Sequence, residues 1–187
     1  MELSELTFVI PVHKDQQIIQ TLNSIPPECK VIVRRDRTRG MARNEGVRLS
    51  DTEYIVLADS DIKFSRQFLD FAISLVGDKK IVGLEAFWPS PLLLSRFCIM
   101  KRSDWHALGG MEDYLQHGEE SDICISAIEK GYLLVKLPRT SIYHYPHPKS
   151  KFKNEYINLF RLIRLHPKFP FMVLRNFLWK MKVSDFD

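Results

Sequence analysis

The stretch YIVLADSD, residues 54–61, decides the fold of this chain. Its first five residues are apolar throughout, which is typical of a strand that is buried on both faces of a parallel sheet. The strand then breaks at Asp59, Ser60 and Asp61. Because ligands of open α/β sheets bind beyond the carboxyl ends of the strands, this stretch predicts a central strand together with one edge of a binding site.

Further strands and helices are predicted on both sides of this stretch. Short apolar runs that favour strands occupy residues 6–12, 30–33, 81–87, 92–100 and 133–137. Helical patterns occupy residues 16–25, 40–49, 65–76, 103–108 and 119–130. Because continuous apolar strands alternate with helices, we expect an α/β fold with a largely parallel sheet covered on both faces.

Length and composition limit the class of protein. The 187 residues, 45% of them apolar, are enough for one globular domain with a sizeable core. No apolar stretch approaches the ~20 residues that cross a bilayer, and the N-terminus lacks the basic and apolar regions of a secretory signal. Cys29, Cys98 and Cys124 form no metal or disulfide pattern, which favours a reducing compartment. We therefore expect a cytoplasmic protein, either free or peripheral at a membrane.

The sequence changes in character after residue 148. Two helical stretches, at about 150–165 and 171–181, are separated by a break that contains Pro167 and Pro170. We therefore predict an α/β domain over residues 1–148 and a helical appendage over residues 149–187.

Charge also separates these two parts. Residues 151–187 hold eight basic and three acidic residues, a net charge of +5, so the rest of the chain carries −1 of the total of +4. The basic residues of the appendage alternate with aromatic ones. This mixture suits an anionic membrane interface, but it also fits helices whose aromatic residues pack on the body and whose basic residues face water. Both alternatives stay open.

Five arginines lie within residues 34–43. Such a run can bind a diphosphate or a nucleic-acid backbone, or it can be a solvated charged loop. The body of the chain is not basic, and no aromatic residues alternate with the arginines. These two features argue against nucleic acid as the partner.

Asp59 and Asp61 are candidate metal ligands. Carboxylate oxygens at this spacing suit Mg²⁺ or Mn²⁺ shared with substrate phosphates, although Asp and Ser also favour an ordinary turn. His144 follows a predicted strand near Ile142 and is a further candidate, since neutral imidazole binds such metals. A structural hydrogen bond is the alternative for this histidine. His166 has no constellation around it and is expected to be structural or at the surface.

The helix that begins at Glu119 has carboxylates in its first turn, where unpaired N–H groups and the helix dipole stabilise them. By helical spacing Glu120 shares a face with Cys124, so we expect it to point toward the body of the protein. Asp122 shares a different face with Glu129. An inward carboxylate at a helix N-terminus stays ionised and can serve as a general base.

Taken in order, these segments resemble glycosyltransferase family 2. The resemblance covers about residues 6–150 and rests on motifs that are each weak alone but occur in the family's order. The motifs are FVIPV at 8–12, GMARNEG at 40–46 (the family's G-x-x-A-R-N-x-G), DSD at 59–61 (its DxD), and GGMED at 109–113 followed by GEESD at 118–122 (its G-G-F-D-E and G-E-D-x-D). The resemblance implies a GT-A, Rossmann-like fold with a mixed, mostly parallel sheet flanked by helices.

The resemblance also implies an activity. This is the inverting, metal-dependent transfer of a sugar from a nucleotide-diphosphate sugar to an acceptor hydroxyl on a glycan, a glycoprotein or a lipid-linked molecule. In this family pattern Glu120, or Glu119 one position away, would take the proton from the acceptor. The metal, Mn²⁺ or Mg²⁺, would be held by Asp59, Asp61 and His144. The donor would be bound by Pro11, Asp36, Arg39, Arg43 and Asp59, with Asp36 at the nucleotide base.

The sequence departs from the family where the second strand ends. The family has paired aspartates followed by Gly-Ser, whereas this chain has Arg35, Asp36, Arg37 and Thr38. The departure leaves the base open and points to arginine contacts with the diphosphate. It also keeps open a non-catalytic relative that binds nucleotide or glycan as a partner module. A sugar-phosphate nucleotidyltransferase is disfavoured, because no glycine-rich loop follows the first strand.

Overall fold

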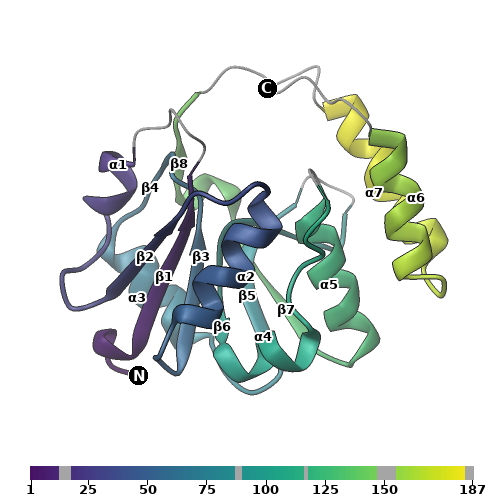
Figure 1. The fold of residues 1–187 in the computed structure, drawn as a ribbon. Helices are drawn as coiled ribbons and strands as arrows, with labels where there is room; N and C mark the ends of the chain where they lie inside the picture. Colours follow the sequence, from purple (N-terminus) through teal and green to yellow (C-terminus); the bar gives the residue numbers. More distant parts are fainter. Residues whose placement is uncertain (13–17, 87–89, 116–117, 147–154, 184–187) are drawn as a thin grey trace.

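The structure is a computed structural model that describes residues 1–12, 18–86, 90–115, 118–146 and 155–183 (Figure 1). Its centre is a six-stranded sheet in the order β2-β1-β3-β6-β5-β7. The bounds are β1 Leu6–Pro11, β2 Lys30–Arg34, β3 Tyr54–Ala58, β5 Lys80–Glu85, β6 Leu93–Lys101 and β7 Leu133–Leu137. Within this sheet β6 runs antiparallel to both of its neighbours, and the other pairs are parallel. The prediction of a mixed, mostly parallel sheet is confirmed.

Helices cover both faces of the sheet (Figure 1). One face carries α2, α4 and α5, and the other carries α1 and α3. Their bounds are α1 Ile19–Leu22, α2 Arg39–Leu49, α3 Arg66–Ser74, α4 Arg102–Leu108 and α5 Glu119–Glu129, with short 3₁₀ helices at Leu3–Glu5 and Arg139–Ser141. Ile55 and Leu57 of β3 point into the first core, and Val56 and Ala58 point into the second. This alternation explains why the strand is apolar without interruption.

Two short strands, β4 Ile62–Lys63 and β8 Tyr143–His144, pair antiparallel beside the main sheet. The sequence predicts a strand near residue 142 but not its partner, which is only two residues long. The helix predicted over residues 16–25 is shorter in the described part of the chain. There α1 covers Ile19–Leu22, and the hydroxyl of its Thr21 donates to the carbonyl oxygens of Asp59 and Ile62 at 3.1 and 2.9 Å. The helix is thereby fixed to the turn that follows β3.

The C-terminal helices are α6 Glu155–Leu165 and α7 Pro170–Val183, and they form a hairpin that packs beside α5 (Figure 1). Their inner faces bury Leu159, Leu162, Val173 and Phe177 in the same core as α5. Along the described ranges, no helix is both long enough and apolar enough to cross a membrane. Because the inner faces of α6 and α7 are buried in the core, the alternative in which the appendage packs on the body holds for these faces.

Candidate active site

Two glycines of the GMARNEG motif let α2 approach its neighbours closely. A Cβ on Gly40 would lie 2.7 Å from the carbonyl oxygen of Glu112, and a Cβ on Gly46 would overlap the side chain of Val9 in β1. Thr38 caps the helix, since its hydroxyl oxygen accepts from the N–H of Met41 at 3.1 Å. The motif therefore seats α2 against β1 and against the GGMED segment.

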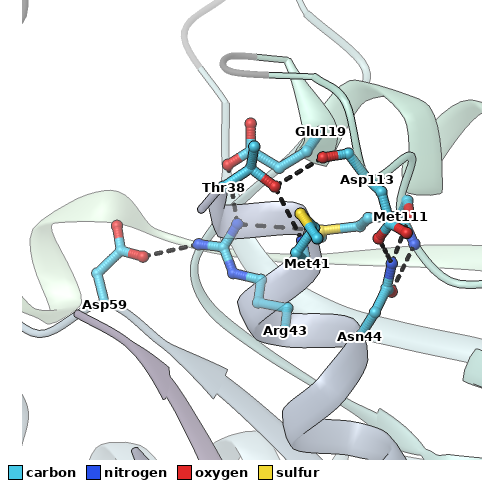
Figure 2. A network of polar contacts seen from close by, with 8 residues as sticks. All are labelled: Thr38, Met41, Arg43, Asn44, Asp59, Met111, Asp113 and Glu119. Carbon is cyan, nitrogen blue, oxygen red and sulfur yellow. Dashed lines mark hydrogen bonds and ion pairs between the residues drawn. The ribbon is translucent and has the colours of Figure 1, made fainter. Parts of the chain in front are cut away.

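Asn44 of the same motif and Thr38, two residues before the motif, fasten the GGMED segment (Figure 2). The side-chain amide of Asn44 donates to the carbonyl oxygen of Met111 at 2.6 Å and to a carboxylate oxygen of Asp113 at 2.7 Å. Its oxygen accepts from the N–H of Met111 at 3.0 Å. The Thr38 hydroxyl donates to the Asp113 carbonyl oxygen at 2.6 Å. Asn44 and Asp113 are 69 residues apart in the sequence. Their contacts therefore join two distant motifs into one unit.

Arg43 connects two further motifs from a fully buried position (Figure 2). Its Nη2 lies 2.8 Å from a carboxylate oxygen of Asp59, the first aspartate of DSD. Its Nη1 lies 2.9 Å from a carboxylate oxygen of Glu119 in GEESD. The sequence predicts Arg43 as a donor contact, whereas the structure has its guanidinium inside the protein. Its guanidinium therefore contacts the carboxylates of Asp59 and Glu119 and not solvent.

Arg39 lies at the solvent-exposed side of this group. The protein around it is dense enough that desolvation lowers its pKa, but nearby carboxylates raise the pKa above its ordinary value by a larger amount. These carboxylates are Asp59, Glu119, Glu120 and Asp61. Five of the predicted site residues are thus close enough to interact at one edge of the sheet.

Asp61 and His144 are brought together by the pairing of β4 with β8. His144 Nε2 lies 3.4 Å from a carboxylate oxygen of Asp61, and both side chains keep about a fifth of their surface exposed, 21% and 17%. Asp59, the third predicted metal ligand, instead contacts Arg43. Among the residues that the structure describes, no group of three or more His, Cys, Asp or Glu side chains is arranged to hold a metal ion. One carboxylate and one imidazole do fit an ion that takes its remaining ligands from substrate phosphates and water.

The two candidate bases differ in their surroundings. Glu119 is 1% exposed and pairs with Arg43. Glu120 is only partly buried and lines a small cavity together with Ile123 and Cys124, so it points toward the body as the helical spacing predicts. Glu120 therefore keeps part of its surface accessible, whereas Glu119 does not.

Asp122 lies on a covered face of α5. Helical spacing predicts that Asp122 shares a face with Glu129, away from Glu120, and the structure agrees. That face is covered by α6 and α7. Asp122 is 7% exposed, accepts from the N–H of Glu112 at 2.7 Å, and lies 2.8 Å from His166 Nε2. The sequence predicts no cluster of polar side chains around His166, whereas the structure places its imidazole against the carboxylate of Asp122. No local pattern indicates a contact between residues 44 positions apart.

A second group lies at the ends of β1 and β2. Pro11 pairs with Arg34 in the strand register, and Arg34 donates two hydrogen bonds to the carboxylate of Asp36, at 2.9 and 2.8 Å. The hydrogen bond to Asp36 raises the pKa of Arg34. The side chains of Arg34 and Asp36 are 31% and 20% exposed, so a ligand can reach this pair. The sequence includes Arg34 in the run of five arginines that can bind a diphosphate, but not as a contact of the nucleotide base.

No protein-family model and no curated protein sequence matches this chain. Solved structures do match. The mannosyltransferase PcManGT of Pyrobaculum calidifontis, solved with GDP-Man and Mn²⁺, matches with a TM-score of 0.63 and 16% identity over 88% of this chain and 63% of that one. A Drosophila β-1,4-galactosyltransferase 7 mutant, solved with manganese, UDP-Gal and xylobiose, has a TM-score of 0.62 and 12% identity over 82% of this chain and 78% of that one.

TarS of Staphylococcus aureus, residues 1–349 in complex with UDP-GlcNAc, matches with a TM-score of 0.63 and 11% identity over 86% of this chain and 64% of that one. The chain thus spans less than two thirds of the length of the PcManGT and TarS structures. Identities this low establish the fold alone. The fold of this chain is similar to that of GT-A glycosyltransferases.

Proposed function

We propose that this protein is an inverting, metal-dependent glycosyltransferase of the family 2 type, which moves a sugar from a nucleotide-diphosphate sugar to an acceptor hydroxyl. The observation that carries the proposal is the cluster around Arg43. This buried guanidinium joins the DSD motif to the GEESD motif through Asp59 and Glu119. The GT-A-like fold and the nucleotide sugars bound by similar structures support the same activity.

The donor binds along the carboxyl edge of the sheet, from β2 to β3. Its base contacts Pro11, Arg34 and Asp36. The exposed pair of Arg34 and Asp36 offers both a donor and an acceptor of hydrogen bonds. Its ribose lies at Asp59, which Arg43 holds in place. The guanidinium of Arg39, a residue with solvent-exposed surface, binds the diphosphate, because it carries a positive charge among the site carboxylates.

Asp61 and His144 would hold Mn²⁺ or Mg²⁺, with the remaining ligands supplied by substrate phosphate and water. Their 3.4 Å separation and partial exposure fit two protein ligands of such an ion. When bound, the metal neutralises negative charge on the leaving nucleoside diphosphate. Side chains of the protein carry out the remaining steps.

Glu120 is the general base. As the acceptor oxygen forms a bond to C1 of the sugar, the bond from C1 to the diphosphate oxygen breaks, and the acceptor proton passes to the Glu120 carboxylate. Glu119 does not serve in this role, since it is buried against Arg43. Its negative charge instead holds the first turn of α5 against α2.

A thermal-shift screen with UDP, GDP, CDP and TDP, each with and without Mn²⁺, tests the donor site. We expect a stabilisation that needs both one nucleotide and the metal, and its loss in Asp61→Asn. The matched control is Asp70→Asn, which removes an exposed carboxylate from α3 and should leave the shift unchanged. No shift with any pair of nucleotide and metal would contradict the proposal.

A binding module without catalysis is the second candidate. It is favoured by the pairing of Asp59 with Arg43, which leaves no three-ligand metal cluster in the described part of the chain. Such a module would bind nucleotide or glycan but would not release nucleoside diphosphate from any nucleotide sugar. Turnover therefore separates the two candidates.

An anionic membrane surface is the proposed partner of the outward faces of α6 and α7. These faces expose large apolar side chains, with Phe160 70% exposed and Phe171 85% exposed. Exposed basic residues lie among them, namely Arg161, Arg164, Lys168 and Arg175. Aromatic and basic side chains on one helical face suit the boundary of headgroups and acyl chains, where a lipid-linked acceptor would be found.

Flotation with vesicles of phosphatidylcholine, with and without phosphatidylglycerol, tests this partner. We expect the protein to float with the anionic vesicles and the double variant Phe160→Ser, Phe171→Ser to stay behind. Phe71→Ser on α3 is the control, because Phe71 is also exposed, at 55%, but lies away from the hairpin. Equal flotation of the wild type and the double variant would contradict the contact.

A further inference from the structure

The interior of the C-terminal hairpin contains two polar side chains that reach the first turn of α5. His166, which directly follows α6, is 2% exposed, and its Nε2 lies 2.8 Å from a carboxylate oxygen of Asp122. Asn176 in α7 is 9% exposed, and its amide donates to the hydroxyl of Ser121 at 2.7 Å. Both contacts are therefore made to residues that directly follow the Glu119–Glu120 pair.

Asp122 extends the His166 contact to the GGMED segment. While one of its carboxylate oxygens faces His166, the other accepts from the N–H of Glu112 at 2.7 Å. The carbonyl oxygen of Glu112 in turn lies against Gly40 of α2. A continuous chain of contacts thus runs from the hairpin to the helix that carries Arg43.

Two more contacts join the hairpin to the segment before α5. Gly118 approaches Leu162 of α6 so closely that a Cβ on the glycine would lie 3.2 Å from a methyl carbon of the leucine. Arg161 donates to the carbonyl oxygen of Tyr114 at 2.9 Å. The hairpin therefore contacts this segment on both sides of residues 116–117, as well as within α5.

The polar contacts are directional in a way that apolar packing is not. A buried imidazole or amide costs free energy unless its hydrogen bonds are made, so His166 and Asn176 favour one placement of the hairpin. Asn176 uses both ends of its amide, since its oxygen also accepts from the hydroxyl of Ser90 at 2.9 Å. Leucines at these two positions would bury apolar surface without fixing the rotation of α5.

We propose that His166 and Asn176 are positioning residues that fix the first turn of α5 and thereby the carboxylate of Glu120. This inference rests on the proposed function, in which Glu120 is the base. Neither residue touches the substrate. The C-terminal hairpin then belongs to the catalytic unit and is more than an accessory to it.

Hydrogen exchange of the backbone amides tests the positioning without any substrate. In His166→Leu and Asn176→Leu we expect the amides of Ser121 and Asp122, which donate to the carbonyl oxygen of Gly118, to exchange about 10-fold faster or more, because each variant leaves a buried partner unsatisfied. Arg175→Gln, an exposed neighbour in α7, is the control and should exchange like the wild type. Unchanged exchange in both leucine variants would overturn the proposal.

Turnover of the nucleotide sugar adds a second readout. If His166→Leu and Asn176→Leu displace the base, each lowers kcat by on the order of 100-fold relative to the wild type, while the donor KM and the Mn²⁺-dependent thermal shift stay the same. His166→Gln should restore most of kcat, since its amide N–H can replace that of Nε2. The proposal would be overturned if the donor KM rose by as large a factor as kcat fell. It would also be overturned if a folded His166→Gln variant did not recover kcat relative to His166→Leu. If the wild type turns over no nucleotide sugar, the proposed function fails, while the exchange experiment still decides whether the hairpin holds α5.

Discussion

Two arginine–carboxylate groups lie at the carboxyl edge of the sheet, and their surroundings differ. Arg43 is fully buried between Asp59 and Glu119. Arg34 pairs with Asp36 at the end of β2, where both side chains keep contact with solvent. The buried group surrounds a guanidinium that is shielded from solvent, and it holds three elements together. The exposed group can exchange its internal hydrogen bonds for bonds to a ligand. The same chemistry thus forms a scaffold in one place and, in the function that we propose, a recognition surface in the other.

The largest expected effect comes from breaking the buried group. Arg43→Met leaves the carboxylates of Asp59 and Glu119 without their cation, and removing one partner of a buried ion pair costs about 3–5 kcal/mol. Urea unfolding measures the loss. Arg48→Met on the exposed side of the same helix is the control, because Arg48 pairs with the exposed Glu45 and its replacement should change the stability little. Similar losses in both variants would remove the distinction.

A smaller effect is expected from the pH dependence of His166. Burial lowers its pKa, but the hydrogen bonds and charges of Asp122 and Glu129 raise the pKa above its ordinary value of 6.5. The stabilisation from the protonated imidazole is therefore fully present below about pH 6.5, the pKa of unfolded histidine, and is lost as the pH rises through the folded value. Unfolding between pH 5 and pH 9 should show this decline in the wild type and not in His166→Gln. The same slope in both proteins would assign the decline to another group.

The smallest effect on stability is expected from opening the exposed group. Arg34→Ala removes the partner of Asp36 at the surface, so the melting temperature should hardly change. The nucleotide that stabilises the wild type should bind about 10-fold more weakly, or a different base should be preferred, since a hydrogen-bonding group at the base is lost. Calorimetric titration with the four nucleoside diphosphates measures both outcomes. An unchanged affinity for every base would show that Arg34 takes no part in recognition.

Much of the fold could be predicted because the information is local. Tyr54–Ala58 is apolar at every position, and the alternation of such strands with helices predicts the sheet and both of its covering layers. The helix predicted over residues 40–49 is α2, Arg39–Leu49, and the side chain of Thr38 caps its first turn. The sequence does not predict β4, because an element of only two residues carries too few side chains to form a pattern.

The candidate site could be predicted only in part, because the roles of its residues depend on distant partners. Arg34, Arg39 and Arg43 are equivalent in sequence as members of one basic run. Packing alone makes Arg43 internal and Arg34 accessible. The contact of Asp122 with His166 likewise depends on how the C-terminal hairpin folds back onto α5. Helical periodicity gives the face on which a residue lies, but not what covers that face.

The most direct test of the central claim is the release of nucleoside diphosphate from nucleotide sugars in the presence of Mn²⁺, measured for the wild type and for Glu120→Gln. We predict turnover by the wild type with one class of donor. The variant should turn over at least about 100-fold more slowly while its Mn²⁺-dependent nucleotide binding is unchanged, because only the proton acceptor is lost. Near-normal turnover by Glu120→Gln would contradict the assignment of the base. Binding without release by the wild type, for every donor tested, would contradict the glycosyltransferase itself.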